Sequence, residues 1–463
     1  MSSNLCGWCA CAFLGGHRRG CGGGSKGVGQ PRWAGGCRRS LLEGPLNSVS
    51  HITSMSLEEA NAASADVNVQ AARSVAEIER LRAEWTAWHC HPNSDIDYFL
   101  ANLQTTPGTL SPHVISVYRD SVLDCLLVGK LQQGLSPVSS LGISLPPARV
   151  LFFVTEGFLG NQSTENAELV VREVLHCLGQ GLADAAEFND LPEYSPLYRA
   201  VKGIPGIRCR DGSPVARTHR RLVLPATFHE YFRGLSSKER SNFRAHGKLL
   251  LNSFPGKVRV DRFCEHQVDI LIRDVETVAA KSYQCALGTG FTVADASALR
   301  LDAQNSALRA YVLYVESEPC AFLLATWYKG TLYGRSIGYV PKYRRFAPGQ
   351  YLLMRFIEDC FRPVAGQPTI AIDPGPGAHQ YKRSFTNHET REYSIVIYAP
   401  TAKGALLNVA RTLVLFGARA GKALLAKTGL TDKVWKIWKT WRERSTSSGR
   451  ASREQSKAAG TGS

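Results

Sequence analysis

The chain has 463 residues, of which 44% are apolar and 9% aromatic, a composition that excludes a wholly disordered chain and a collagen-like or coiled-coil rod. Its formal charge is +16, but residues 1–54 hold six basic and one acidic residue and residues 401–463 hold thirteen and three, so the two ends supply +15 of it. The middle of the chain is nearly neutral, which excludes a basic body that binds nucleic acid.

Residues 1–54 are expected to be a disordered extension or an over-extended start ahead of Met55. Five of the thirteen cysteines lie within the first 37 residues, and the other eight are scattered. An odd count without regular spacing favours reduced thiols in a cytosolic setting, and the spacings fit no usual zinc pattern, so we predict no metal site. The first apolar run is too short and glycine-broken for a signal peptide, and no apolar run is long enough to span a membrane.

The first half of the chain is predicted to form an α/β unit. Val75, Ile78, Leu81 and Trp85 recur at helical spacing after Ser74, which places them on one buried face of a helix. The elements expected after it are a short helix at 95–104, a β-hairpin of 113–119 and 121–130, a strand at 149–154 that leads into a turn at 157–160, a helix at 165–180, an apolar-to-polar segment at 182–191, a helix at 195–202 and a strand at 219–225.

The second half repeats that order of elements. Ser236 opens a helix with a capping-box pattern. The expected elements are a helix at 236–252, a strand at 257–264, a helix at 267–284, strands at 307–317, 319–328 and 331–340, a helix at 348–362, a strand at 368–373, a short helix near 380–386 and a strand at 391–398. Two copies of one α/β unit are the economical interpretation, although the halves share no visible sequence identity.

A short loop of small and basic residues joins strand 331–340 to helix 348–362. The N-terminus of a helix has unpaired N–H groups and a partial positive charge, which together favour an anion. The run Arg344-Arg345-Phe346-Ala347-Pro348-Gly349 resembles the acyl-CoA loop of the GNAT acyltransferases, Gln/Arg-x-x-Gly-x-Gly/Ala. Proline has no N–H, so one donor is missing, and without the resemblance the segment fits a plain strand-to-helix turn. The residues expected to bind acetyl-CoA or another acyl-CoA are Lys342, Arg344, Arg345, Ala347, Gly349, Gln350 and Tyr351.

A second segment narrows the resemblance. Asp373-Pro374-Gly375-Pro376-Gly377 followed by Tyr381-Lys382-Arg383-Ser384-Phe385 resembles the Asp-x-Gly-x-Gly and Tyr-Lys-x-x-Phe signature of the CelD-like acetyltransferases associated with cellulose and exopolysaccharide biosynthesis. Residues 236–244 and 281–291 also look like landmarks of that family. The resemblance covers roughly 75–400 and implies a double GNAT-like fold akin to the FemABX peptidyltransferases, with the catalytic copy C-terminal.

The same resemblance implies direct transfer of an acyl group from CoA to an amine or hydroxyl. Asp373 is then a candidate base or substrate-orienting carboxylate at the end of a strand, Tyr381 a candidate general acid, and Lys382 a ligand for a phosphate or an acidic group. The plain alternatives are a turn cap, a packing aromatic ring and a solvated charge.

The C-terminal region 401–444 is expected to be a basic amphipathic helix. Val434, Trp435, Trp438 and Trp441 share one side, while lysines occupy another, as in helices that lie at a membrane interface. Packing of the apolar side onto the protein is the equal alternative. Residues 445–463 are predicted to be a disordered basic end.

The predicted fold is thus α/β, with GNAT-like domains at 55–230, non-catalytic, and 231–400, catalytic. We expect a cytoplasmic acyltransferase of polysaccharide or cell-envelope biosynthesis that modifies a small-molecule or sugar-linked acceptor, with 401–444 contacting the inner membrane face or the polysaccharide-synthesis machinery. FemABX-like aminoacyl transfer and a degenerate, non-catalytic subunit are the alternatives; Pro348 keeps the second one open.

Overall fold

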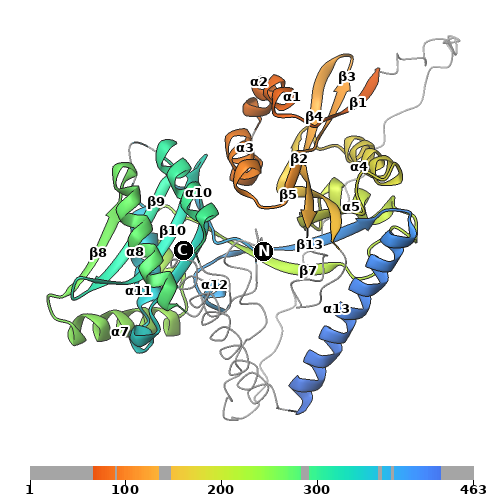
Figure 1. Ribbon diagram of the computed structural model, residues 1–463. Helices are drawn as coiled ribbons and strands as arrows, with labels where there is room; N and C mark the ends of the chain where they lie inside the picture. Colours follow the sequence, from red (N-terminus) through yellow and green to blue (C-terminus); the bar gives the residue numbers. More distant parts are fainter. Residues whose placement is uncertain are drawn as a thin grey trace, which may run out of the picture.

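The computed structural model describes residues 66–88, 91–134, 147–282, 291–362, 366, 368–376 and 380–428. Two lobes flank a pair of long central strands, and a long helix leaves the end of the second of these strands (Figure 1). Residues 1–54, predicted to be an extension or an over-extended start, and residues 445–463, predicted to be a disordered end, lie outside the described residues. So do Trp435, Trp438 and Trp441 of the C-terminal region.

The N-terminal lobe, residues 66–203, confirms most elements predicted for the first half. The hairpin turns at Asp120 and Ser121, which both have positive φ. The turn expected at 157–160 is wrong, because β5 continues through it; a Cβ at Gly157 would lie 2.7 to 3.0 Å from Val154 and Val128 atoms, so this glycine permits close packing within the strand. The elements are β1 Val67–Ala72, α1 Val75–Arg80, α2 Arg82–Ala87, η1 Pro92–Ser94, α3 Ile96–Thr105, β2 Thr109–Pro112, β3 Val114–Arg119, β4 Val122–Gly134, β5 Ala148–Gly160, α4 Thr164–Gly179, β6 Ala185–Pro192 and α5 Pro196–Gly203.

The C-terminal lobe, residues 228–383, has the largest described core, in which strands β9 and β10 are almost completely buried. Helix α10 was not predicted; its pattern is not strongly amphipathic, and it begins at a capping box formed by Thr292 and Asp295. The elements are α6 Phe228–Gly234, α7 Ser237–Ser253, β8 Val258–Phe263, η3 Glu265–Gln267, α8 Val268–Lys281, α10 Val293–Gln304, β9 Leu308–Val315, β10 Glu318–Tyr328, β11 Thr331–Tyr339, η4 Pro341–Phe346, α11 Pro348–Cys360, β12 Ala371–Asp373 and α12 Gln380–Arg383.

The two lobes share one sheet, because their last strands lie side by side in its centre. The strand order is β1-β3-β4-β5-β6-β13-β7-β12-β11-β10-β9-β8, with β2 paired to β4. Strand β7, Val215–Val223, pairs with β12 of the C-terminal lobe, and β13, His388–Tyr398, pairs with β6 of the N-terminal lobe. The two also pair antiparallel with each other across the middle of Figure 1. Each half therefore completes the sheet of the other, which the order of elements alone does not predict.

Helix α13, Ala402–Thr428, follows β13 and packs one side against the sheet. Leu407 joins Tyr398, Val396 and Val150 in a small buried cluster. The buried Arg411 donates a 2.6 Å hydrogen bond to Asp211. The expected packing of the 401–444 region onto the protein is thus seen for the inner side of α13.

Candidate active site

Strands β11 and β12 are the parallel neighbours between which a thioester was expected to enter. They pair only over Thr331–Tyr333 and Ala371–Asp373, and β12 then ends while β11 continues for six more residues. Beyond Tyr333, β11 is paired only with β10 among the described strands. From Gly334 onward, no described strand lies on the side of β11 opposite β10.

A β-bulge interrupts this edge at its start. Leu324 pairs with Ser336 while Ala325 pairs with Gly334, which leaves Arg335 as the extra residue. Bulges turn backbone groups away from the ladder and are common beside active sites. The bulge lies next to the point where the two strands separate.

Asp302 of α10 holds the bulge in place through hydrogen bonds. Its fully buried carboxylate accepts hydrogen bonds from Arg335 Nε and Nη2, at 2.7 and 3.0 Å, and from Thr326 Oγ1 at 2.8 Å. Tyr98 of the N-terminal lobe adds a fourth bond of 2.6 Å. One carboxylate thus connects the bulge to the contact between the lobes.

The predicted acyl-CoA loop lies at the far end of β11, before α11. The expected loop between strand and helix contains a 3₁₀ turn, η4. Ala347 has φ 49° and ψ 50°, the left-handed conformation, which permits a sharp entry into the helix. Its carbonyl accepts the N–H groups of Gln350 and Tyr351. Among the described residues the Gly349 N–H has no hydrogen-bond partner, so it is the amide of this turn that remains available for a phosphate.

The basic residues of the loop have different surroundings. Lys342 is turned toward Glu318 at the start of β10, with a 2.7 Å ion pair. Arg344 and Arg345 are exposed, and neither forms an ion pair with a described residue. Gln350 Oε1 lies 2.9 Å from His246 Nδ1 on α7, and the Tyr351 ring packs beside Gly247 of the same helix. The two arginines are thus the better placed of the predicted cations to meet a diphosphate.

Asp373 is the most highly paired of the predicted site residues. It is 2% exposed, and its Oδ1 lies 2.7 Å from His219 Nε2 and accepts the Gly375 N–H at 2.7 Å. Its Oδ2 accepts a 2.7 Å hydrogen bond from Arg221 Nε. Both oxygens are therefore engaged, and burial, which opposes the charge, is outweighed by the hydrogen bond and charge of His219, so the pKa of Asp373 is lowered. This geometry disfavours the predicted role as a free base.

His219 is held between two carboxylates at the centre of the sheet. Its Nδ1 lies 2.6 Å from Glu392 on β13, opposite the bond of its Nε2 to Asp373. Burial opposes the imidazolium, but the hydrogen bonds and charges of the two carboxylates raise the pKa of His219 to about 10. His219 is thus a cation at neutral pH. Arg221 extends the network to Glu156 on β5 of the N-terminal lobe at 2.6 Å.

His91 of the N-terminal lobe lies near the separation of β11 and β12. Its ring meets the ring of Tyr333 edge-on, with centroids 4.3 Å apart. Burial lowers its pKa, so the ring is neutral, and Nδ1 accepts the Asn93 N–H at 3.0 Å. The proton therefore resides on Nε2, which makes His91 a donor rather than a base.

Lys382 and Tyr381 lie on the short helix α12. Lys382 is fully buried, and its Nζ donates to the carbonyls of Gly375 and Pro376 at 2.8 and 2.9 Å. It therefore holds the loop that follows Asp373, which disfavours the predicted role as a phosphate ligand. Tyr381 is half-buried, and its ring stacks on Phe385 with centroids 6.0 Å apart.

Sequence reasoning did not identify His219, Arg221, Glu392, Asp302 or Arg335. One signal was present: His219 and Arg221 alternate along a predicted strand, where a buried face is normally apolar. The partners of His219, Asp373 and Glu392, lie more than a hundred residues away in the sequence. The alternation along one strand therefore could not predict these pairs.

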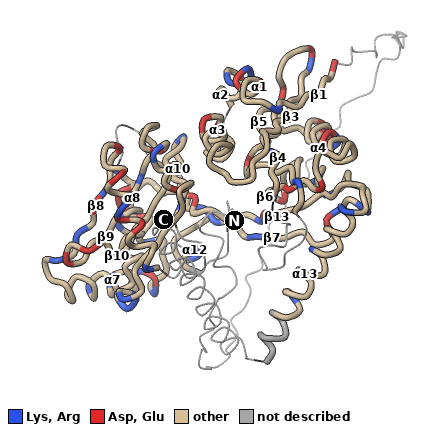
Figure 2. The backbone as a smooth tube through the Cα atoms, viewed as in Figure 1, with Lys and Arg blue, Asp and Glu red and all other residues tan. Residues whose placement is uncertain are grey.

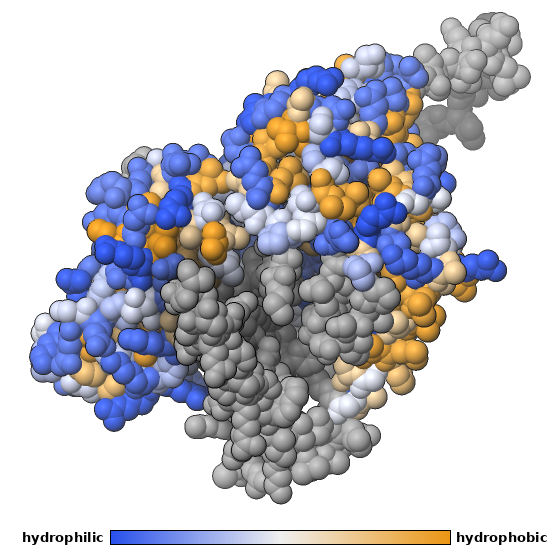
Figure 3. All heavy atoms as spheres, in the orientation of Figure 1, coloured by the Kyte–Doolittle hydropathy of each residue, from blue (hydrophilic) through white to orange (hydrophobic). Residues whose placement is uncertain are grey.

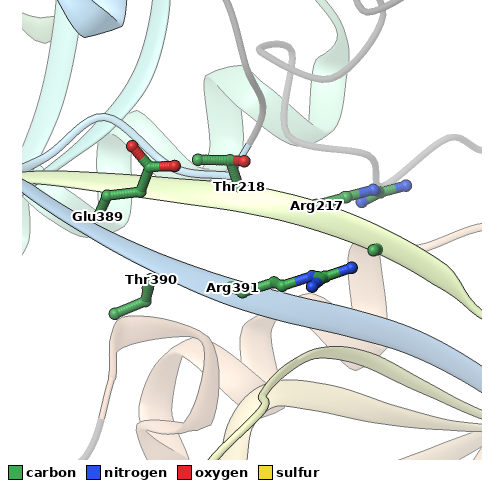
Figure 4. A pocket seen from close by; sticks show the side chains of 6 residues that line it. Arg217, Thr218, Glu389, Thr390 and Arg391 are labelled. Carbon is green, nitrogen blue, oxygen red and sulfur yellow. The ribbon is translucent and has the colours of Figure 1, made fainter.

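A shallow hollow on β7 and β13 is separate from the predicted residues. Figure 4 shows the Arg217 and Arg391 side chains along neighbouring strands, directed toward the same end. Arg217 lies 3.5 Å from Asp190, and Arg391 lies over the Tyr393 ring. None of the predicted site residues lines this hollow, whose lining is Ala216, Arg217, Thr218, Glu389, Thr390 and Arg391.

Comparison with known families bears on the C-terminal lobe. Residues 237–383 match the acetyltransferase (GNAT) domain. The match runs from α7 to α12 and includes β11, the acyl-CoA loop and Asp373. It confirms the predicted GNAT domain in this part of the chain, and domains of this family use acyl-CoA. No curated protein matches the sequence.

Three solved structures are similar to this chain at low identity. FemX is 9% identical, with 69% of this chain and 95% of FemX covered and a TM-score of 0.48. A tandem GNAT protein from the clavulanic acid biosynthesis pathway is 10% identical, with 72% and 100% covered and a TM-score of 0.44. L-PGS from Bacillus licheniformis is 14% identical, with 62% and 86% covered and a TM-score of 0.35. The predicted fold class, a mixed α/β sheet flanked by helices, is confirmed by the sheet and helices of the structure and by the GNAT domain match.

Proposed function

We propose that this protein is an acyltransferase that transfers an acetyl or other acyl group from CoA to an amine or hydroxyl of a small-molecule or sugar-linked acceptor in polysaccharide or cell-envelope biosynthesis. The observation that carries the proposal is the separation of β11 from β12, with the bulge at Arg335, inside the lobe that matches a GNAT domain. The CelD-like resemblance of residues 373–385 supports the class of acceptor.

In this proposal, residues near one end of β11 bind the diphosphate of the donor, and residues near the other end bind its thioester. At one end, the Gly349 N–H and the exposed Arg344 and Arg345 face the diphosphate of the donor. At the other, backbone groups where β11 and β12 separate stabilise the thioester carbonyl as negative charge develops on it. The acceptor enters where β11 and β12 part, between the lobes.

Asp373 acts in this proposal as a positioning residue. Its carboxylate joins β12 to His219 and Arg221 of β7 and so fixes where β12 ends. Lys382 fixes the loop that follows through two carbonyls. These residues keep the gap between the strands open, and neither needs to change its protonation state during the reaction.

Tyr381 remains the candidate acid for the departing thiolate. Tyr381→Phe is expected to lower turnover by about tenfold to a thousandfold if its hydroxyl supplies the proton. Turnover is followed as release of free CoA thiol from acetyl-CoA with a mixture of cell-envelope sugar precursors, whose acylated products are identified by mass spectrometry. Tyr194→Phe, at an exposed position, is the control. Equal turnover of Tyr381→Phe and the unaltered protein removes Tyr381 from the mechanism.

The turn before α11 also favours a second candidate, a non-catalytic subunit of a polysaccharide-synthesis complex. Pro348 has no N–H, and the amides of Ala347, Gln350 and Tyr351 already bond to backbone carbonyls. Calorimetric titration with acetyl-CoA separates the two candidates. Saturable binding at micromolar concentrations supports the enzyme. No binding up to about a millimolar of acetyl-CoA, which corresponds to a binding free energy weaker than about −4 kcal/mol, supports the subunit.

Pro348→Ala tests whether the turn before α11 binds the diphosphate, by adding the N–H group that proline lacks. The alanine restores an N–H at the first helical position, and a hydrogen bond to a charged phosphate contributes about 1 kcal/mol or more. We expect acetyl-CoA to bind about three- to tenfold more tightly, as measured by calorimetry. Pro341→Ala, at the first position of η4, is the matched control and should bind as the unaltered protein does. Unchanged affinity of Pro348→Ala would place the diphosphate elsewhere.

A further inference from the structure

Helix α13 has two different sides. Its inner side is anchored by Leu407 in the cluster with Tyr398 and by the buried Arg411–Asp211 pair. Its outer side is apolar, although nothing among the described residues covers it. The outward side chains Leu406, Val409, Leu413 and Phe416 are between 57% and 69% exposed. We call these four residues the outer stripe.

The outer stripe is continuous along the helix. Its members follow one another at steps of three, four and three residues, which places them on one line along the surface. Ala405, Gly417 and Ala420, which flank the stripe along the helix, are also exposed, with Arg419 at the edge. In Figure 3, orange residues gather at the lower right, where α13 runs in Figure 1. Large exposed apolar patches of this kind mark interaction surfaces.

The charge of the surrounding chain distinguishes among possible partners. Helix α13 contains five basic residues and no acidic one, and Figure 2 shows no red along it. The sequence that follows, 429–463, adds eight basic and three acidic residues together with Trp435, Trp438 and Trp441. A second copy of this region would bring two strongly positive segments together, whereas an anionic lipid surface complements the charge.

We propose that the outer stripe of α13 docks the protein on the surface of a membrane that contains anionic lipid. The stripe enters the boundary between headgroups and acyl chains, while the anchored inner side keeps the lobes in water. No helix among the described residues is long and apolar enough to cross a membrane, so α13 lies along the surface. The sequence that follows contains tryptophans and lysines, residue types that favour a membrane interface.

The test is co-sedimentation of the full chain with vesicles of 70% phosphatidylcholine and 30% phosphatidylglycerol, compared with phosphatidylcholine alone. We expect binding to the mixed vesicles that is about tenfold stronger than binding to the neutral ones. Leu413→Glu combined with Phe416→Glu should weaken binding to the mixed vesicles at least about thirtyfold. The double variant loses two apolar side chains that enter the lipid in this proposal, and it adds two negative charges that the anionic lipid repels.

The matched control is Val122→Glu combined with Val293→Glu, which makes the same change in charge at exposed valines of β4 and α10. It should bind within about threefold of the unaltered protein, and both double variants should unfold within about 2 °C of it, because all four positions are exposed. Equal weakening in the two double variants, or full binding by the α13 variant, overturns the proposal. The proposal is also overturned if the unaltered protein does not bind vesicles but self-associates through the outer stripe. Light scattering would then give a lower mass for the α13 variant than for the unaltered protein and the control variant.

Discussion

Replacing His219 by leucine is expected to lower the unfolding temperature of the protein by about 3–5 °C. The substitution leaves Asp373 and Glu392 buried without the cation that lies between them, and breaking a buried ion pair by removing one partner costs about 3–5 kcal/mol. In a protein of this size each kcal/mol moves the unfolding temperature by roughly 1 °C. Calorimetric scans of both proteins measure the difference.

Arg220→Leu is the control for this substitution. Arg220 neighbours His219 on β7, but it faces the other side of the sheet and pairs with the exposed Glu389. A surface pair contributes about 0–1 kcal/mol, so the unfolding temperature should move by less than about 1 °C. Comparable losses in the two variants would show that β7 tolerates no change, rather than that the buried histidine matters.

The same site predicts how stability depends on pH. Because the folded-state pKa of His219 is raised from 6.5 to about 10, its contribution is complete below pH 6.5 and is lost as the pH rises toward 10. The pKa of Asp373 is lowered from 3.8, so its contribution is present above pH 4 and is lost as the solution becomes more acidic. Denaturant titrations from pH 6 to 10 should show a decline that His219→Leu lacks. Parallel curves for the two proteins would contradict the charged state assigned to His219.

Asp302→Ala is expected to impair both stability and acyl transfer. It removes the acceptor of four hydrogen bonds and the carboxylate of the Arg335–Asp302 ion pair, which costs about 3–5 kcal/mol. The bulge then loses the support that fixes its backbone groups, and a displacement of about 1 Å at a reacting group lowers turnover by about a hundredfold. Hydrogen exchange of the β11 amides, thermal unfolding and thiol release from acetyl-CoA measure the three effects.

Tyr98→Phe separates the contact between the lobes from the support of the bulge. It deletes the hydrogen bond from the N-terminal lobe and leaves Arg335 and Thr326 on Asp302. The expected cost is about 1 kcal/mol, with β11 exchange unchanged. A turnover loss in Tyr98→Phe as large as in Asp302→Ala would assign the effect to lobe placement instead of the bulge.

Local patterns predicted the elements around the site well. The hairpin of β3 and β4, the helices α4, α5, α7 and α8, and the succession of β11, loop and α11 all lie within a few residues of their expected positions, because hydrophobic period and capping residues act over a few positions. The 3₁₀ turn η4 was missed, since Pro341 and Pro348 fit the start of either kind of helix.

The chemical states of the predicted residues were less accessible to sequence reasoning. Asp373 at the end of β12 was found from its motif, but its engagement by His219 and Arg221 was not. Lys382 was expected to meet a ligand, and it instead binds the carbonyls of Gly375 and Pro376. A side chain's partners depend on which strands become neighbours, and a motif does not contain that information.

The amino-acid sequence by itself determined the α/β elements, the loop before α11 and the excess of positive charge at the two ends of the chain, because each depends on residues close together in the chain. Only the tertiary structure decided that β7 and β13 exchange between the lobes. That exchange brings His219 and Glu392, 173 residues apart, onto one face beside Asp373. The partners of a strand are chosen by the packing of the whole sheet, whereas alternation along a strand reports only which side is buried.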